Sequence, residues 1–286
     1  MWDLKDYLIA SNPAEALEMM RKGPGTGKFI AGGTDLFLHK PSCDFVVDIS
    51  RAGLTDIAST PTGDLFIGAA ATLENLAGNP FVQQFACGAI SKMAALCGNR
   101  PVRSTATMGG NLCNALPSAD LAPVLLALDA TCFIIDDQQQ ESLPLAEFFV
   151  GPRLTVLDDR LLVGVALPAE SSTWRCHCHK LTRAAEDISL MQVAVALGLE
   201  DDQVAEVRIA LGAVAPVPMR ATMAEDFLTD MPVTELTGEI IADAAEIAAG
   251  EAEPISDHRA SEEYRRDMVR VFTRRLLTRA VEGGAS

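Results

Sequence analysis

Two short segments combine paired glycines with a hydroxyl and polar side chains, a combination suited to binding an anion. The first runs from Phe29 to Leu36 and reads FIAGGTDL; the second runs from Thr107 to Asn111 and reads TMGGN. Glycine permits positive φ and close approach, so successive N–H groups can turn toward one anion. Two such nests would suit a diphosphate held between two loops. The alternative is that each glycine pair only marks a structural turn. Neither segment has the GxGxxG spacing of a Rossmann site.

A third glycine-rich segment, Gly23–Lys28, resembles a phosphate loop but lacks its defining residues. A P-loop needs glycine where this chain has Lys22, and serine or threonine where it has Phe29. We therefore interpret it as a turn that leads into a strand.

The run Cys176-His177-Cys178-His179 resembles a metal-binding cluster. In a strand, however, the two cysteines would share one face and the two histidines the other. The other five cysteines are scattered and lack the spacing of an iron–sulfur site. The sequence therefore predicts a strand here, and neither a metal ion nor a cluster within this chain.

Composition excludes several classes of function. The 286 residues carry a net charge of −16, which disfavours nucleic acids and anionic membrane surfaces. The most apolar stretch, 188–199, is shorter than the ~20 residues of a membrane span. The first 20 residues do not resemble a secretory signal, and the seven cysteines form no disulfide framework. We expect a cytoplasmic protein with reduced thiols.

Proline, glycine and hydrophobic periodicity divide the first half into short elements. Asn12 is a predicted N-cap for a helix with Pro13 at its first position, ending near Lys22. Thr72 is a predicted cap for another helix, and Pro80–Leu96 should be mostly helical. Further predicted elements are an apolar helix over 120–128 and five strands, over 28–30, 45–49, 65–67, 131–135 and 161–167.

A polar stretch at Ala169–Thr173 is the predicted domain boundary. Beyond it we expect a strand over Arg175–Leu181 and a hairpin that turns at Asp201-Asp202. Two helices follow, at about Thr237–Ala249 and Ser261–Val281. Strands followed by helices predict an α+β second half.

Several motifs together resemble the FAD-binding subunit of molybdenum hydroxylases, the family that includes the flavin subunits of bacterial xanthine, carbon monoxide and nicotinate dehydrogenases. The similarity covers essentially the whole chain, in family order. The matching segments are AGGTDL at 31–36, TMGGNL at 107–112, PSADLAP at 117–123, KLTRAAEDI at 180–188, LGAVAP at 211–216 and PISDHR at 254–259.

The resemblance implies an α+β architecture in two parts. Residues 1–170 would form an FAD-binding domain of the vanillyl-alcohol-oxidase-like (PCMH) type, with subdomains of about 1–55 and 56–170. Residues 174–282 would form a C-terminal domain with a three-stranded antiparallel sheet and helices.

The resemblance also assigns the cofactor-binding residues. Both glycine loops would hold the FAD diphosphate and ribityl chain, Asn114 and Asp120 would bind ribityl or ribose hydroxyls, and the Leu162 backbone would lie against a ring. Lys180 would approach the polar edge of the flavin; the alternative is an exposed strand lysine. The loop residues are Phe29, Ile30, Ala31, Gly32, Gly33, Thr34, Asp35, Leu36, Thr107, Met108, Gly109, Gly110 and Asn111.

By the same resemblance, this chain would carry noncovalent FAD and pass electrons between other subunits. A large subunit would hold the molybdenum cofactor, and a small subunit would hold two [2Fe–2S] clusters. NAD or another acceptor would take the electrons, and a xanthine dehydrogenase is the favoured type. Alternatives are the flavin subunit of a nicotinate, other N-heterocycle or carbon monoxide dehydrogenase, an assembly module without flavin, or a free-standing flavin oxidase.

Two charged features remain open. Arg183 and Asp187, four residues apart, are expected to pair at the surface. Seven arginines between 259 and 279 form either a solvated basic helix face or a docking strip for an acidic partner subunit.

Overall fold

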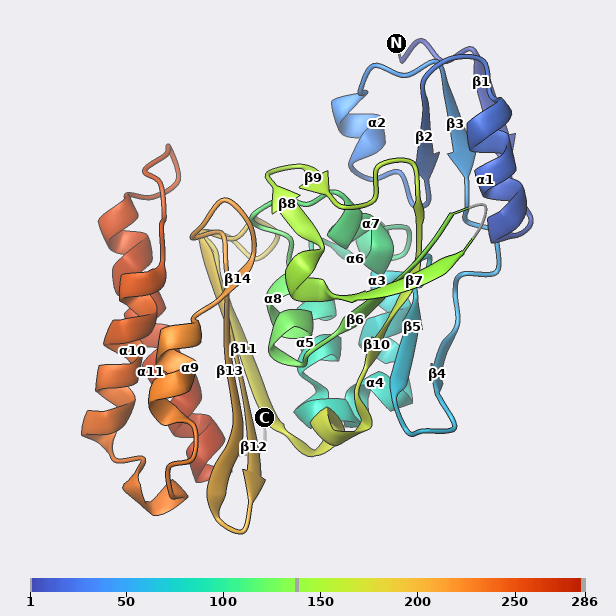
Figure 1. The fold of residues 1–286 in the computed structure, drawn as a ribbon. Helices are drawn as coiled ribbons and strands as arrows, with labels where there is room; N and C mark the ends of the chain where they lie inside the picture. The colour runs from blue at the N-terminus through green and yellow to red at the C-terminus, as the bar shows by residue number, and fades with distance from the viewer. Residues whose placement is uncertain (1, 137–138, 284–286) are drawn as a thin grey trace.

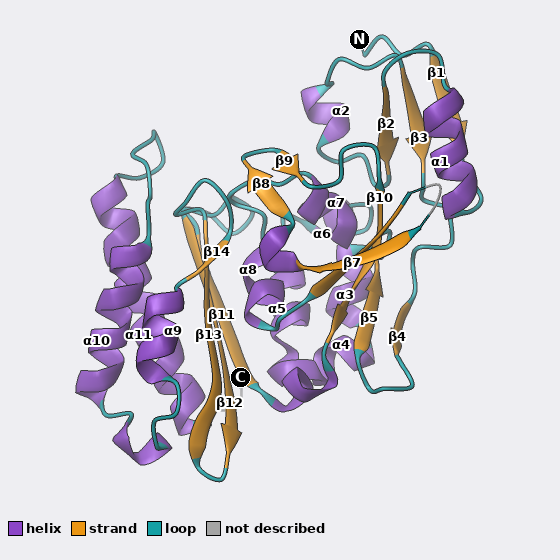
Figure 2. Ribbon diagram, in the orientation of Figure 1, coloured by secondary structure: helices purple, strands orange, loops and turns teal. Residues whose placement is uncertain are grey.

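The computed structural model describes residues 2–136 and 139–283 and builds them around three main sheets (Figure 1). A three-stranded sheet comes first, a five-stranded sheet lies in the middle of the molecule, and a four-stranded sheet follows. Figure 2 shows the last helices covering one face of the four-stranded sheet, while the other face turns toward the middle of the molecule. Within the described ranges, no helix is long and apolar enough to cross a membrane.

The N-terminal sheet is parallel, with the strand order β1-β3-β2. The Asn12 side chain accepts a hydrogen bond from the Glu15 amide and Pro13 opens the first helix, so the predicted cap is confirmed. The first glycine pair lies between β2 and α2. The elements are β1 (Asp6–Ile9), α1 (Pro13–Lys22), β2 (Gly27–Ile30), α2 (Leu36–His39) and β3 (Phe45–Asp48).

The central sheet is antiparallel, with the order β4-β5-β10-β6-β7. Its middle strand, β10 (Leu161–Leu167), comes from the end of this segment of the chain. The other strands are β4 (Ile57–Ser59), β5 (Leu65–Gly68), β6 (Thr131–Ile135) and β7 (Gln140–Pro144). A small hairpin, β8 (Phe149–Gly151) and β9 (Leu154–Thr155), lies outside this sheet.

Short helices lie between this sheet and the four-stranded sheet (Figure 1), and two predicted helical segments differ from the structure. The segment 80–96 is broken because Ala86, Cys87 and Gly88 all have positive φ. The predicted helix over 120–128 is shortened to α8. Thr72 caps α3 as predicted. The helices are α3 (Leu73–Gly78), α4 (Pro80–Gln84), α5 (Ala89–Ala95), α6 (Arg100–Arg103), α7 (Met108–Cys113) and α8 (Ala122–Ala127).

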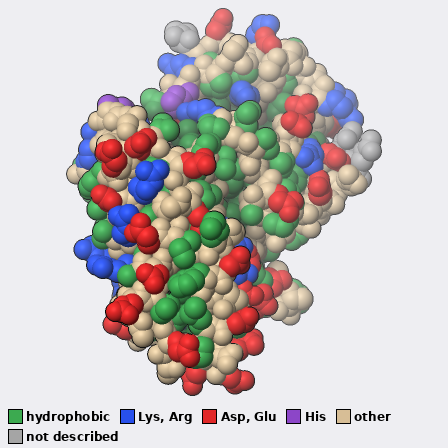
Figure 3. All heavy atoms as spheres, turned by 60° about the vertical axis from the view of Figure 1, so that its left-hand side comes forward, with side chains coloured by type: hydrophobic (Ala, Val, Ile, Leu, Met, Phe, Trp, Pro, Cys, Tyr) green, Lys and Arg blue, Asp and Glu red, His purple; other side chains and the backbone are tan. Residues whose placement is uncertain are grey.

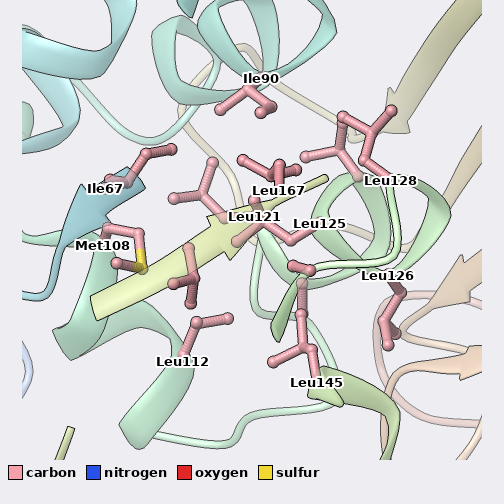
Figure 4. Close-up of a cluster of buried hydrophobic side chains, with 14 of the residues drawn as sticks. Ile67, Ile90, Met108, Leu112, Leu121, Leu125, Leu126, Leu128, Leu145 and Leu167 are labelled. Atoms are coloured by element: carbon pink, nitrogen blue, oxygen red, sulfur yellow. The ribbon is translucent and has the colours of Figure 1, made fainter. Parts of the chain in front are cut away.

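The largest hydrophobic cluster fixes the helix that carries the second glycine pair. Met108 and Leu112 of α7 pack with Ile67 of β5 and Leu121 just before α8 (Figure 4). These four side chains are fully buried. Since Gly109 and Gly110 lie between the two α7 anchors, their backbone is held firmly in place.

The C-terminal sheet has four strands, so the expectation of three is wrong. Met219–Arg220 forms a short edge strand, β14, opposite Ala210 and Leu211. The predicted hairpin is confirmed, with Asp201 and Asp202 both at positive φ in its turn. The remaining elements are β11 (Arg175–Leu181), β12 (Met191–Glu200), β13 (Gln203–Gly212), α9 (Thr222–Leu228), α10 (Gly238–Glu251) and α11 (Glu262–Glu282).

Candidate functional site

The two glycine segments, here called loop 1 (residues 29–36) and loop 2 (residues 107–111), meet through direct backbone contact. A Cβ atom on Gly32 would lie 1.7 Å from the Thr105 carbonyl oxygen, just before loop 2. A Cβ on Gly109 would lie 2.6 Å from the Ala69 carbonyl oxygen. Glycine is therefore needed at both positions for packing alone, whatever the loops bind.

Loop 1 presents unused backbone donors. The amides of Gly32, Gly33, Thr34 and Asp35 donate no hydrogen bond within the described part of the chain, and neither does the Thr34 hydroxyl. Gly33 has φ +68°, a left-handed conformation that suits glycine. A run of free N–H groups around such a residue is the geometry of an anion-binding nest.

Loop 2 is built differently, and the prediction of a second nest is wrong. The Met108 amide donates to Ala71 O at 2.9 Å and the Gly109 amide to Ala69 O at 2.8 Å. The Gly110 amide donates to the Thr107 hydroxyl at 3.0 Å, which is the N-cap bond of α7. Loop 2 instead offers open space beside Gly110, where a ligand could approach the backbone. A Cβ on Gly110 would meet Thr107 Oγ1 at 2.9 Å and otherwise open space.

An arginine that the sequence analysis missed joins the two loops. Arg153, in the turn between β8 and β9, donates to the Asn114 side chain at 2.8 Å and to Asp35 at 3.4 Å. Its second terminal nitrogen lies 3.2 Å from His39 Nε2. We call Arg153, Asp35, His39 and Asn114 the arginine clasp. The sequence gives no signal for it, because the clasp arginine lies in a turn of a hairpin that the strand pattern did not reveal.

A second polar group, here called the Asp120 hub, is formed by Asp120, Lys180, Gln192 and Cys97. Lys180 Nζ donates to Asp120 Oδ2 at 2.9 Å and to the Leu96 carbonyl at 3.1 Å. Its side chain is 3% exposed, so it is not the exposed strand lysine of the alternative prediction. Because Lys180 is on β11 and Asp120 lies just before α8, the hub joins the C-terminal sheet to the central part of the molecule.

The remaining hub residues are also buried. Gln192 donates from Nε2 to the other Asp120 oxygen and to Ser189 Oγ. The Cys97 thiol donates to Asp120 at 2.9 Å; burial first, and the carboxylate second, raise the pKa of this thiol. Gln192 was visible in the sequence as a polar residue within the apolar run 188–199, which is the signal that could have identified it.

Two other predicted residues have structural tasks in this region. Asn111 accepts a hydrogen bond from the Leu121 amide at 3.1 Å, which ties loop 2 to the segment that carries Asp120. The Leu162 side chain is buried in the large hydrophobic cluster, and the β10–β6 pairing shifts register between Leu162 and Gly164. Only the backbone of Leu162 is therefore suited to meet a ligand.

The segments rejected as sites have the structures predicted for them. Residues 23–26 form a turn that leads into β2, which contains Gly27 and Lys28, and Cys176–His179 belongs to β11. Cys178 faces Ala89 of α5, whereas His179 stacks on Phe272 of α11, so the strand does alternate. Across residues 2–136 and 139–283, no three His, Cys, Asp or Glu side chains come together as a metal site would require.

The predicted surface charges are largely paired. Arg183 and Asp187 lie 3.5 Å apart as expected. The arginines of α11 do not form one basic strip, since Arg265 is buried against Asp257 and Arg270 pairs with Glu246 and Asp267. Figure 3, which brings the side of the C-terminal helices forward, shows basic and acidic side chains next to one another.

Comparison with known proteins gives matches along the chain. Residues 3–170 match the family described as the FAD binding domain in molybdopterin dehydrogenase, and residues 177–280 match the CO dehydrogenase flavoprotein C-terminal domain. The chain is 30% identical to a xanthine dehydrogenase FAD-binding subunit of Escherichia coli, over 98% of this chain and 97% of that protein.

Comparison with solved structures also gives matches over nearly the whole chain. A chain of the carbon monoxide dehydrogenase from Hydrogenophaga pseudoflava, in a form that lacks the Mo-pyranopterin moiety, superposes with a TM-score of 0.90 and 26% identity. It covers 96% of both chains. A chain of quinoline 2-oxidoreductase from Pseudomonas putida 86 gives a TM-score of 0.88 and 25% identity, over 98% of both chains.

Proposed function

Because this chain belongs to the flavoprotein family of the molybdopterin dehydrogenases, we propose that it is the FAD-carrying electron-transfer subunit of a molybdenum hydroxylase. It is an oxidoreductase subunit. The observation that carries the proposal is the meeting of the two loops. The four free amides of residues 32–35 abut a second glycine segment that leaves open space at Gly110.

The residues present fit a dinucleotide diphosphate. The loop 1 amides and the Thr34 hydroxyl are donors without internal acceptors in the described chain, as an anion requires. The absence of a Cβ at Gly110 lets the ligand approach the α7 backbone closely. We propose that residues 29–36 and 107–111 hold the diphosphate and ribityl chain of FAD, without a covalent bond.

The other predicted contacts remain part of the proposal. Asn114 and Asp120 would bind ribityl or ribose hydroxyls, and the backbone of Leu162 would lie against one of the rings. Lys180 would act at the polar edge of the flavin. Since its ammonium group is paired with Asp120, it would present a lysine–carboxylate pair rather than a lone positive charge. Bound FAD would supply two-electron redox chemistry, which the protein would orient and tune.

The proposed domain division follows the resemblance. Residues 1–170 would form a PCMH-type FAD-binding domain with subdomains at about 1–55 and 56–170, and residues 174–282 would form the C-terminal domain. In support, the first sheet lies within residues 6–48 and the central sheet within residues 57–167. All seven cysteines are free, which supports the proposed cytoplasmic location.

We propose that the partners are a molybdenum-binding large subunit and a small [2Fe–2S] subunit, with NAD or another compound as the final electron acceptor. A xanthine dehydrogenase is favoured because a relative with 30% identity over nearly its full length carries that name. Flavin subunits of nicotinate, other N-heterocycle or carbon monoxide dehydrogenases are the alternatives. A free-standing flavin oxidase is a weaker candidate.

Two measurements on the purified chain test the proposal. Oxidised flavin absorbs at about 370 and about 450 nm, so a visible spectrum should show it, and acid denaturation should release it to the supernatant. The chain alone should not oxidise xanthine or nicotinate with a dye acceptor. A colourless protein that takes up no added FAD would contradict the proposal, and turnover of either substrate would favour the free-standing oxidase.

A further inference from the structure

We propose that Arg153 is the cation that pairs with the diphosphate of the ligand held between the two loops. The inference rests on the proposed function and deepens it. Arg153 contacts Asp35 of loop 1 and Asn114 just after loop 2, so one guanidinium bridges loop 1 and the segment that follows loop 2. Nothing in the motifs of either loop assigns this residue.

The charge of the site supports this role. Loops 1 and 2 contain no lysine or arginine, Asp35 adds a negative charge, and the whole chain carries −16. Lys180, the basic residue that the resemblance assigned to the cofactor, is paired with Asp120. Arg103, which precedes loop 2, is paired with Glu74. Among the lysines and arginines of the described chain, Arg153 is the one that pairs with a residue of either loop, so it is the cation positioned for a diphosphate there. Guanidinium forms paired, charge-assisted hydrogen bonds with phosphate oxygens.

The present partners of Arg153 are of a kind that a ligand can replace. The side chains of Arg153, Asp35 and His39 are 45%, 32% and 50% exposed, and ion pairs in such positions are weak. His39 Nε2 lies 3.2 Å from both Arg153 and Asp35 Oδ1. A ring nitrogen either accepts from the arginine or donates to the carboxylate, so these two contacts exclude one another.

The backbone, in contrast, holds Arg153 in place. Arg153 has φ +61° and Ala115 has φ +45°, values that residues with a side chain rarely adopt. The two are joined by a hydrogen bond of 2.8 Å from the Arg153 amide to the Ala115 carbonyl. Only the side chain would therefore need to turn from the clasp to the diphosphate.

The test compares Arg153→Gln with Arg100→Gln in protein freed of flavin. Arg100 is a matched control because it is 78% exposed and pairs with Glu74, a residue outside both loops. FAD affinity is measured by titration at low and at high sodium chloride. We expect Arg153→Gln to weaken FAD binding roughly 10- to 100-fold, the effect of losing a hydrogen bond to a charged group. The salt dependence of FAD affinity should also become smaller, while Arg100→Gln changes neither.

Three results would overturn the inference. One is an unchanged FAD affinity in Arg153→Gln. The second is a weaker affinity with the wild-type salt dependence, since that would mean that Arg153 only stabilises the conformation of the loops. In both cases wild-type protein still binds FAD, and the proposed function stands. The third is a wild-type protein that binds no FAD, which would remove the proposed function and this inference together.

Discussion

The arginine clasp and the Asp120 hub are both polar junctions between distant segments, yet they differ in burial. The clasp side chains of Arg153, Asp35 and His39 are one-third to one-half exposed. In the hub, Lys180 is 3% exposed and Asp120 11%. Exposed groups exchange their partners for a ligand at little cost, whereas buried charges depend on one another. We infer that the clasp serves binding and that the hub mainly fixes the C-terminal sheet against the central part.

The largest effect should follow from breaking the hub. Lys180→Met would leave the Asp120 carboxylate buried without its cation, so we expect a loss of about 3–5 kcal/mol in the free energy of unfolding. Chemical denaturation measures it. Lys22→Met is the control, since Lys22 is 67% exposed in its pair with Glu18, and its effect should stay within about 0.5 kcal/mol.

The double variant Lys180→Met/Asp120→Asn sharpens this prediction. It removes both charges and should recover a large part of the lost stability, because no buried charge remains unpaired. If Lys180→Met costs no more than the Lys22 control, the hub does not hold the parts together. A lower flavin reduction potential in Lys180→Met would support the proposed role at the flavin edge.

Glycine substitutions separate packing from binding within the loops. Gly32→Ala should destabilise the fold by about 1–3 kcal/mol, because its Cβ would overlap the Thr105 carbonyl and the backbone must move. Gly110→Ala should keep the fold, because its Cβ would require only a small shift of the Thr107 hydroxyl, and it should weaken FAD binding. Gly78→Ala is the control, since its Cβ meets nothing within 4 Å. Thermal melts measure the stability of each variant, and FAD titration of the same samples measures its affinity for FAD. Full FAD affinity in Gly110→Ala would exclude loop 2 from the site.

A buried histidine of β11, His177, predicts that the stability of the fold depends on pH. Burial first, with the charges of Arg279 and Lys92, lowers the pKa of His177 from 6.5 to about 4. Its Nε2 atom has no hydrogen-bond partner among the described residues. The unfolded chain therefore binds this proton more readily, and stability is lost as pH falls from about 6.5 to 4, by at most ~1.4 kcal/mol per pH unit.

The measurement is denaturation at several pH values in that window. His177→Gln should show a smaller loss on acidification than wild type. His258→Gln, at an exposed position, should keep the wild-type slope. Equal slopes in all three proteins would mean that His177 does not contribute to acid sensitivity.

The smallest effect should follow from loosening the clasp. Asp35→Asn removes one exposed carboxylate, and we expect a change in unfolding free energy below about 1 kcal/mol. A loss as large as that of Lys180→Met would show that the clasp is structural, and the contrast between the two junctions would fail.

Local patterns predicted much of this architecture. Asn12 and Thr72 cap helices as their types and positions indicate, and the Cys-His-Cys-His run alternates between two faces as a strand requires. The break at Ala86 and Cys87 was not predictable, because neither residue type favours positive φ. The short strand β14 was missed because two residues carry no periodic signal.

The candidate site was predictable only in part. The paired glycines marked both loops, yet residue type could not tell that Thr107 and the Ala69 and Ala71 carbonyls consume the loop 2 amides. The contacts of Arg153 with Asn114 and Asp35 join residues 39 and 118 positions apart in the sequence. The contact of Lys180 with Leu96 joins residues 84 positions apart. Only the tertiary fold brings such pairs together.

The most direct test of the central claim is amide hydrogen exchange of the flavin-free protein with and without saturating FAD. The amides of residues 32–35 have no acceptor within the described chain, so they should exchange fast in the free protein. If they hold the diphosphate, FAD should slow their exchange strongly. Unchanged exchange at residues 32–35 under saturating FAD would contradict the claim that loop 1 binds the cofactor.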